Sequence, residues 1–318
     1  MTAVLCDESG APDLSEVEDL TELRLATGHD LASVLPGAQA LFVWDFTSAA
    51  LADVWPSAST LRWVHTASAG VDRLLFPGLV GSDVVVTNSR GVFEQAIAEY
   101  VLGCILAFAK DLTGTVTLQA ERRWRHRESE RIAGRRALII GTGPIGRATA
   151  RLLAAADMRV AGLGRRSRTG DPDFGRVHAQ GDLLEVLGWA DYVVMAAPLT
   201  EQTCGMLDRT AFRSMKPSAR LVNVGRGPTV VEDDLVDALR NGEIAGAALD
   251  VFTEEPLPAT SALWDMPGLI VSPHMSGDAE GWEDELVRLF AENLRHWQTG
   301  QPLRNVVDKQ LGYVPTSG

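Results

Sequence analysis

Cysteine, positive charge and long apolar runs are all scarce in this sequence. The 318 residues include only three cysteines, Cys6, Cys104 and Cys204. Their number and wide spacing match neither a disulfide framework nor a zinc-binding pattern. We therefore expect buried free thiols, no metal site and a reducing, cytoplasmic location. No apolar run is long enough to cross a membrane, and the N-terminus lacks the basic and apolar segments of a secretory signal.

Acidic residues outnumber lysine and arginine, 42 to 29, which leaves a net charge of −13. A protein that binds nucleic acid needs a basic surface for the phosphates, so nucleic acid is excluded as the main partner. The apolar share of 46% and the charged share of 22% are typical of a globular protein. Because 318 residues exceed what one compact core usually supports, we expect two domains.

Short apolar runs alternate with helical or loop segments along the whole chain. This alternation predicts an α/β fold with two doubly wound parallel sheets, each covered on both faces. The first set of predicted strands is AVLC (3–6), ALFVW (40–44), LRWVHT (61–66) and DVVVTN (83–88). The second set is RALII (136–140), RVAGL (159–163), DYVVMAA (191–197), RLVNV (220–224), AALDVF (247–252) and LIVS (269–272).

Two long helical patterns flank the second set of strands. One runs over 93–119 without a proline, and the other over 281–299. This order suggests a domain inserted into another, with the last helix returning to the first, and a pocket in the cleft between the two. The charged segment 122–135 is expected to be an exposed connector, and the tail after Asn305 to be loosely held.

The first strand of the second set ends in the glycine pattern GTGPIG. A strand, such a loop and then a helix are what a dinucleotide site requires. Gly141 permits the tight turn, Gly143 lets the backbone approach a pyrophosphate, and Gly146 lets helix and strand pack closely. Pro144 suits the first helical turn, and the amide of Ile145 faces the phosphates at the positive end of the helix.

An acid normally follows these glycines by about 20 residues and binds the adenosine ribose. No acid appears here between Val160 and Gly170. Arg165 and Arg166 stand there instead and can grip a 2′-phosphate through forked, charge-assisted hydrogen bonds, with Ser167 adding a hydroxyl. The other interpretation is that these arginines are ordinary exposed loop residues. NADP is favoured as the cofactor, and NAD is the alternative.

Three further stretches carry polar side chains at or just past predicted strand ends, where α/β proteins form their sites. LVNVGRG offers Arg226 between two glycines. ALDVFTEEPLP offers Asp250, Glu254 and Glu255, and VSPHMSG offers His274. Of the two glutamates, Glu255 is chosen because it stands directly before a proline.

Together with GTGPIG, these stretches resemble the D-isomer-specific 2-hydroxyacid dehydrogenases, and the variants TNSRGV and GRRSR resemble the glyoxylate/hydroxypyruvate reductase-like branch. The resemblance also includes MKPSARLVNVGRG, VEDDLVDALRNGEIAGAALDVF and SAGVD, and it covers nearly the whole chain. It implies an NADP-binding Rossmann domain over 93–281, inserted into a flavodoxin-like substrate (catalytic) domain formed by 1–92 and 282–318. It also implies a homodimer through the cofactor domain, with the helix after Phe93 as a candidate contact.

The resemblance assigns the catalytic set to Arg226, Glu255 and His274. The chemistry is coherent, because reduction of a 2-keto acid requires a hydride at C2 and a proton at the developing alkoxide. His274, with an ordinary pKa of about 6.5, is the natural proton donor. Glu255 would stabilise the imidazolium and raise that pKa, and Arg226 would bind the carboxylate and polarise the keto oxygen.

Further site residues are expected on both domains. Backbone amides of Ala69, Gly70 and Val71 would bind the substrate carboxylate, and Trp44 either walls the pocket or packs in the core. Toward the cofactor we expect Pro198 and Val224, which follow or end predicted strands. Asp250 either contacts the nicotinamide amide or only caps a turn.

These residues predict an oxidoreductase that transfers a hydride between NADP(H) and a small 2-keto or 2-hydroxy acid, of the glyoxylate/hydroxypyruvate reductase type. The alternative from another class is a dinucleotide-sensing interaction protein, like the corepressors that share this fold. The complete Arg–Glu–His set favours the enzyme. Related formate dehydrogenases have a glutamine in place of the glutamate, so Glu255 argues against that chemistry.

Overall fold

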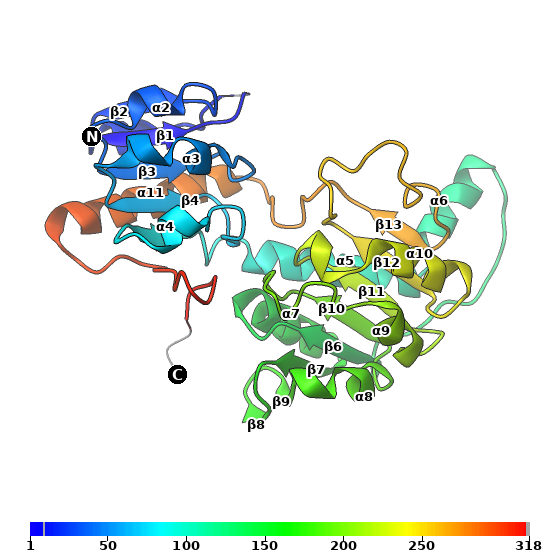
Figure 1. The fold of residues 1–318 in the computed structure, drawn as a ribbon. Helices are drawn as coiled ribbons and strands as arrows, with labels where there is room; N and C mark the ends of the chain where they lie inside the picture. Colours follow the sequence, from blue (N-terminus) through cyan, green and yellow to red (C-terminus); the bar gives the residue numbers. More distant parts are fainter. Residues whose placement is uncertain (9, 316–318) are drawn as a thin grey trace. The chain divides into compact units, whose positions relative to one another are not determined.

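The computed structural model describes residues 1–8 and 10–315 as two α/β units (Figure 1). The first unit consists of Met1–Phe93 together with the chain from Ala279 onward, and the second of Glu94–Asp278. Each unit has its own sheet and its own hydrophobic core. The expected fold class, α/β with two doubly wound sheets, is confirmed.

The first unit is built on a five-stranded sheet in the order β2-β1-β3-β4-β5, in which all neighbours are parallel. Three of its strands are buried along their whole length, as expected for a sheet covered on both faces. The strands are β1 (Thr2–Leu5), β2 (Leu23–Ala26), β3 (Ala40–Val43), β4 (Trp63–Thr66) and β5 (Val85–Thr87). The helices are α1 (Ser15–Glu18), α2 (Leu31–Val34), α3 (Ala50–Asp53), α4 (Pro77–Val80) and α11 (Trp282–Thr299).

Helix α11 packs against this first sheet although it lies at the far end of the sequence (Figure 1). Phe290 stacks on Phe42 with ring centroids 4.3 Å apart, and on Trp63 at 5.2 Å. The helix begins after Gly281 and ends before Gly300, and both glycines have positive φ. A glycine directly after the last helical residue is a common signal for a helix end, and Gly300 provides it in the sequence. Aromatic stacking therefore joins the two separate segments of this unit.

The second unit is built on an eight-stranded sheet in the order β13-β12-β11-β10-β6-β7-β9-β8, in which only β8 and β9 pair antiparallel. Its strands are β6 (Arg136–Ile140), β7 (Arg159–Gly164), β8 (Arg168–Asp171), β9 (Gly175–Ala179), β10 (Tyr192–Met195), β11 (Arg220–Asn223), β12 (Gly246–Leu249) and β13 (Leu269–Val271). Its helices are α5 (Glu94–Ala109), α6 (Leu112–Ala120), α7 (Pro144–Ala155), α8 (Leu183–Leu187), α9 (Arg209–Ser214) and α10 (Glu232–Arg240). The strands β2, β8 and β9 were not predicted from the sequence.

The long helix predicted over 93–119 is wrong in one respect, because the chain breaks it into α5 and α6 with a bend of 62°. Asp111 takes a left-handed conformation with φ of 47° and caps α6 by accepting a hydrogen bond from the amide of Gly114. Arg127 pairs with the same carboxylate. Of the described helices, none alone is long and apolar enough to cross a membrane, and only the bent pair α5–α6 reaches that threshold.

Two smaller expectations also need correction. Over residues 306–315 the tail is held rather than loose, because Val306 pairs with Thr87, Val307 is buried, and the Lys309 ammonium donates to three backbone carbonyls. Residues 316–318 lie outside the described part of the chain. Cys204 is exposed, whereas the other two cysteines are buried as expected. Tertiary contacts decide both features.

Candidate active site

Three predicted site residues follow three neighbouring parallel strands of the second sheet. Arg226 comes after β11, Asp250 directly after β12, and His274 after β13. Because β11, β12 and β13 pair in parallel register, their carboxyl ends meet at one edge of the sheet. The topology therefore brings these residues to the same edge, where α/β proteins bind their ligands.

His274 and Glu255 form a direct pair. The imidazole Nδ1 lies 3.0 Å from Glu255 Oε2, and the other carboxylate oxygen accepts a hydrogen bond from the amide of Phe252 at 2.9 Å. With Glu255 ionised, Nδ1 carries the proton of this bond, and Nε2 faces away from the carboxylate as the atom able to exchange a proton. The side chain of His274 is 38% exposed and that of Glu255 is 19% exposed, so the pair is reachable from solvent.

Asp250 holds the turn that carries His274. It is fully buried, and one oxygen accepts hydrogen bonds from Ser272 Oγ at 2.6 Å and from the amide of Met275 at 2.9 Å. Its other oxygen accepts from the amide of Ser276 at 2.9 Å. His274 itself has φ of 52°, an unusual conformation for a residue with a side chain. The structure thus shows Asp250 capping a turn, which is one of its two expected roles. Its contact with the nicotinamide amide stays a prediction.

Arg226 sits on a turn that lies tightly against neighbouring backbone. A Cβ at Gly225 would come within 2.8 Å of the Ala197 carbonyl oxygen, and a Cβ at Gly227 would overlap the backbone of Phe252. Only glycines therefore fit on either side of the arginine. The guanidinium of Arg226 is half-buried and donates to the Gly225 carbonyl at 2.9 Å.

Sequence reasoning missed the residues that support this site. Asn223 accepts from the amide of Gly225 and donates to the carbonyl of Arg226, an arrangement that an asparagine two residues before a glycine could have signalled. Ser272, which donates to Asp250, also contacts the hydroxyl of Tyr100 from α5. The contact between Tyr100 and Ser272 spans 172 residues, so no local pattern predicts it.

The glycine loop has the geometry that a dinucleotide requires. Gly141 has φ of 106°, and a Cβ there would lie 2.7 Å from the backbone of Ala196. A Cβ at Gly146 would overlap the carbonyl oxygen of Gly141, so strand and helix pack as closely as expected. At Gly143, in contrast, a Cβ would meet nothing within 4 Å. Its missing side chain leaves open space at the start of α7, where Pro144 and Ile145 form the first turn and amides can bind phosphate.

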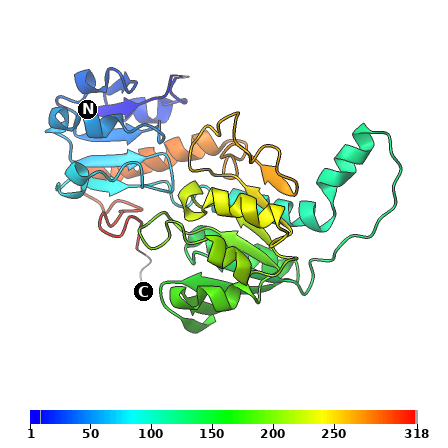
Figure 2. The same cartoon turned by 45° about the vertical axis from the view of Figure 1, so that its right-hand side comes forward.

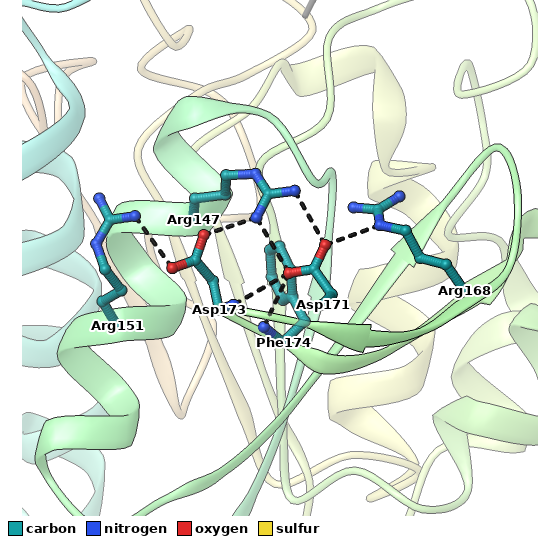
Figure 3. Close-up of polar contacts among 6 residues, drawn as sticks. All are labelled: Arg147, Arg151, Arg168, Asp171, Asp173 and Phe174. Atoms are coloured by element: carbon teal, nitrogen blue, oxygen red, sulfur yellow. Dashed lines mark hydrogen bonds and ion pairs between the residues drawn. The ribbon is translucent and has the colours of Figure 1, made fainter. Parts of the chain in front are cut away.

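Arg165, Arg166 and Ser167 form the exposed loop between β7 and β8. The loop follows β7, the second strand of this unit along the chain. In NAD-binding proteins, the acid that binds the ribose stands at the end of this second strand. The first acid after the loop is Asp171, and its carboxylate is occupied by arginines (Figure 3). The arginines of the loop thus carry side chains of the kind that bind phosphate.

Two further residues expected near the cofactor lie at strand ends in the same unit. Pro198 is exposed, and its carbonyl accepts a hydrogen bond from Thr203 Oγ1 at 2.6 Å. Val224 is buried, and its amide donates to the Met195 carbonyl at 3.0 Å. Val224 therefore joins the ends of β10 and β11, while Pro198 lies in the loop that follows β10.

In the first unit, the segment after β4 presents backbone amides. Asn88 donates to the Ala69 carbonyl at 2.6 Å, and Ser68 donates to the Gly70 carbonyl at 2.5 Å. Within the described part of the chain, the amides of Ala69, Gly70 and Val71 make no hydrogen bond. The carbonyls of Ala69 and Gly70 thus accept hydrogen bonds from side chains of the same unit. The three amides remain able to bind an anion. Asn305 of the tail donates to the carbonyl of Asn88, which links the tail to this loop.

Trp44 belongs to the aromatic cluster of the first unit. Its side chain is 7% exposed and stacks on Trp282, with ring centroids 6.0 Å apart, while its edge contacts Phe42 at 5.9 Å. These contacts match the core interpretation of Trp44, and its role as a pocket wall stays a prediction.

The cofactor-binding part of the chain matches a known family. The family described as D-isomer specific 2-hydroxyacid dehydrogenase, NAD binding domain, matches residues 102–276, which is more than half of the chain. The chain belongs to the D-isomer specific 2-hydroxyacid dehydrogenase family. The resemblance noted from the motifs is thereby confirmed.

Relatives within the 2-hydroxyacid dehydrogenase family extend the similarity to both units. The glyoxylate reductase of Thermofilum pendens is 30% identical over 266 residues, which cover 82% of this chain and 78% of that protein. A D-isomer specific 2-hydroxyacid dehydrogenase from Xanthobacter autotrophicus Py2, solved in complex with NADPH and MES, is 31% identical with a TM-score of 0.85, covering 98% of this chain and 99% of that one.

A third member of the family, the NADPH-dependent glyoxylate/hydroxypyruvate reductase of Sinorhizobium meliloti in complex with NADP and sulfate, is 28% identical with a TM-score of 0.84. The match covers 98% of this chain and 100% of that one. This chain is accordingly an NAD(P)-dependent D-2-hydroxyacid dehydrogenase with the two-sheet architecture of its family.

Proposed function

We propose that this dehydrogenase reduces a small 2-keto acid of the glyoxylate or hydroxypyruvate type with NADPH as the electron donor. The observation that carries the proposal is the pair formed by His274 and Glu255, 3.0 Å apart beside the strand ends of the cofactor-binding sheet. Relatives named glyoxylate reductase and a neighbour solved with NADP support the substrate class and the cofactor.

In the proposed mechanism, each residue acts through a particular atom or group. A bound NADPH would supply the hydride for C2. His274 would hold a proton at Nε2 for the developing alkoxide, while its Nδ1–H donates to Glu255, which keeps the ring oriented. Arg226 is proposed to bind the substrate carboxylate and to polarise the keto oxygen through its planar guanidinium.

The remaining roles are assigned in the same proposal. In the second unit, Arg165, Arg166 and Ser167 bind the 2′-phosphate. The glycine loop binds the pyrophosphate, and Pro198, Val224 and Asp250 support the nicotinamide end. In the first unit, the amides of Ala69, Gly70 and Val71 bind the substrate carboxylate. Trp44 shapes the substrate site in that unit.

A homodimer through the second unit is part of the proposal. Helix α6 has no buried residue among its nine. The segment after it is mostly exposed and extends away from the rest of this unit (Figure 2). The side chain of Trp124 in that segment is fully exposed, and Val116 on α6 is 66% exposed. Large apolar side chains in such positions are typical of an association surface.

The test is a steady-state screen of purified enzyme with NADPH and with NADH against glyoxylate, hydroxypyruvate, pyruvate and phenylpyruvate. We expect the highest kcat/KM with NADPH and one of the first two acids. A higher kcat/KM with NADH would contradict the cofactor assignment. Oxidation of neither cofactor by any keto acid would contradict the catalytic assignment.

A further inference from the structure

A cluster of charged side chains lies beside the loop Arg165–Ser167, between helix α7 and the hairpin formed by β8 and β9 (Figure 3). We call it the clamp, and its members are Arg147, Arg151, Arg168, Asp171 and Asp173. Arg147 belongs to the first turn of α7, directly after the last glycine of the loop GTGPIG. The clamp thus joins the two segments proposed to bind phosphates.

Asp171 is the centre of the clamp. Arg147 grips its carboxylate with both terminal nitrogens, each 3.0 Å from a different oxygen, and Arg168 Nε donates to it at 2.8 Å. The amides of Asp173 and Phe174 donate to the same carboxylate at 3.1 and 3.2 Å. A forked arginine–carboxylate pair with further donors is among the strongest polar contacts in proteins and fixes geometry as well as charge.

The clamp anchors β8 by charge rather than by apolar packing. Along the edge strand β8, Arg168, Thr169 and Gly170 are exposed, and only Asp171 is buried. The guanidinium partners hold the pKa of Asp171 well below its usual range, so the carboxylate stays ionised at neutral pH. An edge strand with one buried side chain depends on that side chain for its position.

The hairpin and the glycine loop both lie close to β7. The guanidinium of Arg147, in the first turn of α7, lies over the ring of Phe174 at 5.5 Å. Phe174 is buried, and a Cβ at Gly162 of β7 would come within 3.0 Å of both that ring and the methyl group of Thr142. The hairpin therefore contacts the first turn of α7, and no space is left at Gly162 between β7, Phe174 and Thr142.

Only three residues connect β7 to β8, and they are the proposed 2′-phosphate ligands. One end of this loop is fixed by Gly164, which pairs with Ala179 of β9. The other end is fixed by Arg168, which pairs with Val177 and is tied to Asp171. Through its bond to Asp171, Arg168 is tied to the clamp at the end of the loop.

We propose that Arg147 and Asp171 are positioning residues for cofactor selectivity. Their forked ion pair holds the loop Arg165–Ser167 in the conformation that binds a 2′-phosphate, without either side chain contacting the cofactor. This inference rests on the proposed preference for NADP. It goes further by locating part of that preference in a pair of residues 24 positions apart, outside the phosphate-binding loop itself.

The experiment measures dissociation constants for NADP and NAD by calorimetry in the absence of substrate. The wild type is compared with Asp171→Asn, which keeps the side-chain volume but removes the charge, and with Arg147→Lys, which keeps the charge but loses the fork. We expect Asp171→Asn to weaken NADP binding about tenfold and to change NAD binding less than twofold. Arg147→Lys should give a smaller loss of the same kind.

The matched control is Asp191→Asn. Asp191 also forms an ion pair, with Lys216 at 2.6 Å, and accepts a backbone hydrogen bond from Arg136. Asp191 directly precedes β10 and so lies at the amino-terminal ends of the strands, whereas the glycine loop follows the carboxyl end of the neighbouring strand β6. Asp191→Asn should lower stability without changing the ratio of the dissociation constants for NADP and NAD.

The outcomes separate the two proposals. Equal losses of NADP and NAD binding in Asp171→Asn, or an unchanged ratio, would overturn the positioning role while leaving the NADP preference standing. A wild type that binds NAD more tightly would overturn the proposed cofactor and this inference together. If Asp171→Asn fails to fold, Arg147→Lys decides, and an unchanged ratio in that variant overturns the inference.

Discussion

The imidazole of His274 and the carboxylate of Glu255 form a hydrogen-bonded pair whose second carboxylate oxygen is held by the backbone amide of Phe252. The carboxylate is thereby restrained on both sides, and the imidazole presents its remaining nitrogen in one orientation. A positioned imidazole of this kind is a typical general acid and base.

Replacing His274 by alanine removes the proposed proton donor. Because general acid catalysis contributes about 10²- to 10⁴-fold in rate, we expect kcat for keto-acid reduction to fall by that factor, with little change in the dissociation constant for NADPH. Stopped-flow rates and fluorescence titration of NADPH measure the two quantities. His29→Ala, at an exposed position, is the control. Wild-type turnover in His274→Ala would refute the assignment.

Glu255→Gln keeps the shape of the side chain but removes its charge. The carboxylate pairs with the imidazole Nδ1 and holds the ring in one orientation, so we expect its loss to lower kcat for keto-acid reduction about tenfold or more. Steady-state kinetics provide the measurement. Glu254→Gln alters the adjacent, exposed glutamate and should leave kcat unchanged. The orienting role is contradicted if the two variants behave alike.

Arg166→Ala tests the loop between β7 and β8. A hydrogen bond to a charged group is worth about 1.5–3 kcal/mol, which corresponds to roughly a 10- to 100-fold rise in KM for NADPH and little change for NADH. Arg176→Ala changes another exposed arginine of the neighbouring hairpin and serves as the control. Equal effects on both coenzymes would argue that Arg166 does not bind the 2′-phosphate.

His65 should make the stability of the first unit depend on pH. It is fully buried, and burial lowers its pKa to about 3, while its nitrogens contact Thr87 at 2.7 Å and Ser89 at 3.3 Å. Below pH 6.5 the unfolded chain binds a proton that the folded chain does not bind until about pH 3. Stability therefore falls as the pH drops through this window, by up to about 1.4 kcal/mol per pH unit.

Urea denaturation at pH 7, 6 and 5 measures this dependence. His65→Gln should be less stable than the wild type at pH 7 but should show a smaller decline toward pH 5. His29→Gln, which alters an exposed histidine, should retain the full decline. An undiminished decline in His65→Gln would show that other groups cause it.

Trp124→Glu tests the proposed homodimer. In a dimer the exposed indole would be buried in the association surface, where a charge is costly. We therefore expect light scattering to show a monomer for the variant and a dimer for the wild type. Trp264→Glu, at a half-exposed tryptophan of the same unit, is the control. A monomeric wild type would end the proposal.

Much of the site was predictable because its signals are local. The glycine loop, Arg226, Glu255 and His274 each lie in a short motif, and such motifs stand where parallel strands end. Alternating apolar runs predicted most strands, since a buried parallel strand needs a continuous apolar segment. The strands β2 and β8 escaped prediction because they are mostly exposed and lack that segment.

Other features depend on contacts that no local pattern contains. A single left-handed residue, Asp111, splits the helix predicted as continuous, and Lys309 holds the tail through carbonyls more than 200 positions away in sequence. No sequence pattern marked the acids of the clamp, which pair with Arg147 only in the folded chain.

The amino-acid sequence by itself determined the α/β class, the dinucleotide loop and the chemical types of the three residues proposed as catalytic, because periodicity and turn chemistry act over a few neighbouring residues. Only the tertiary structure decided which carboxylates pair with which guanidinium groups in the clamp. Such pairs form wherever the folded backbone brings opposite charges within hydrogen-bonding distance, and that separation is unrelated to their spacing along the chain.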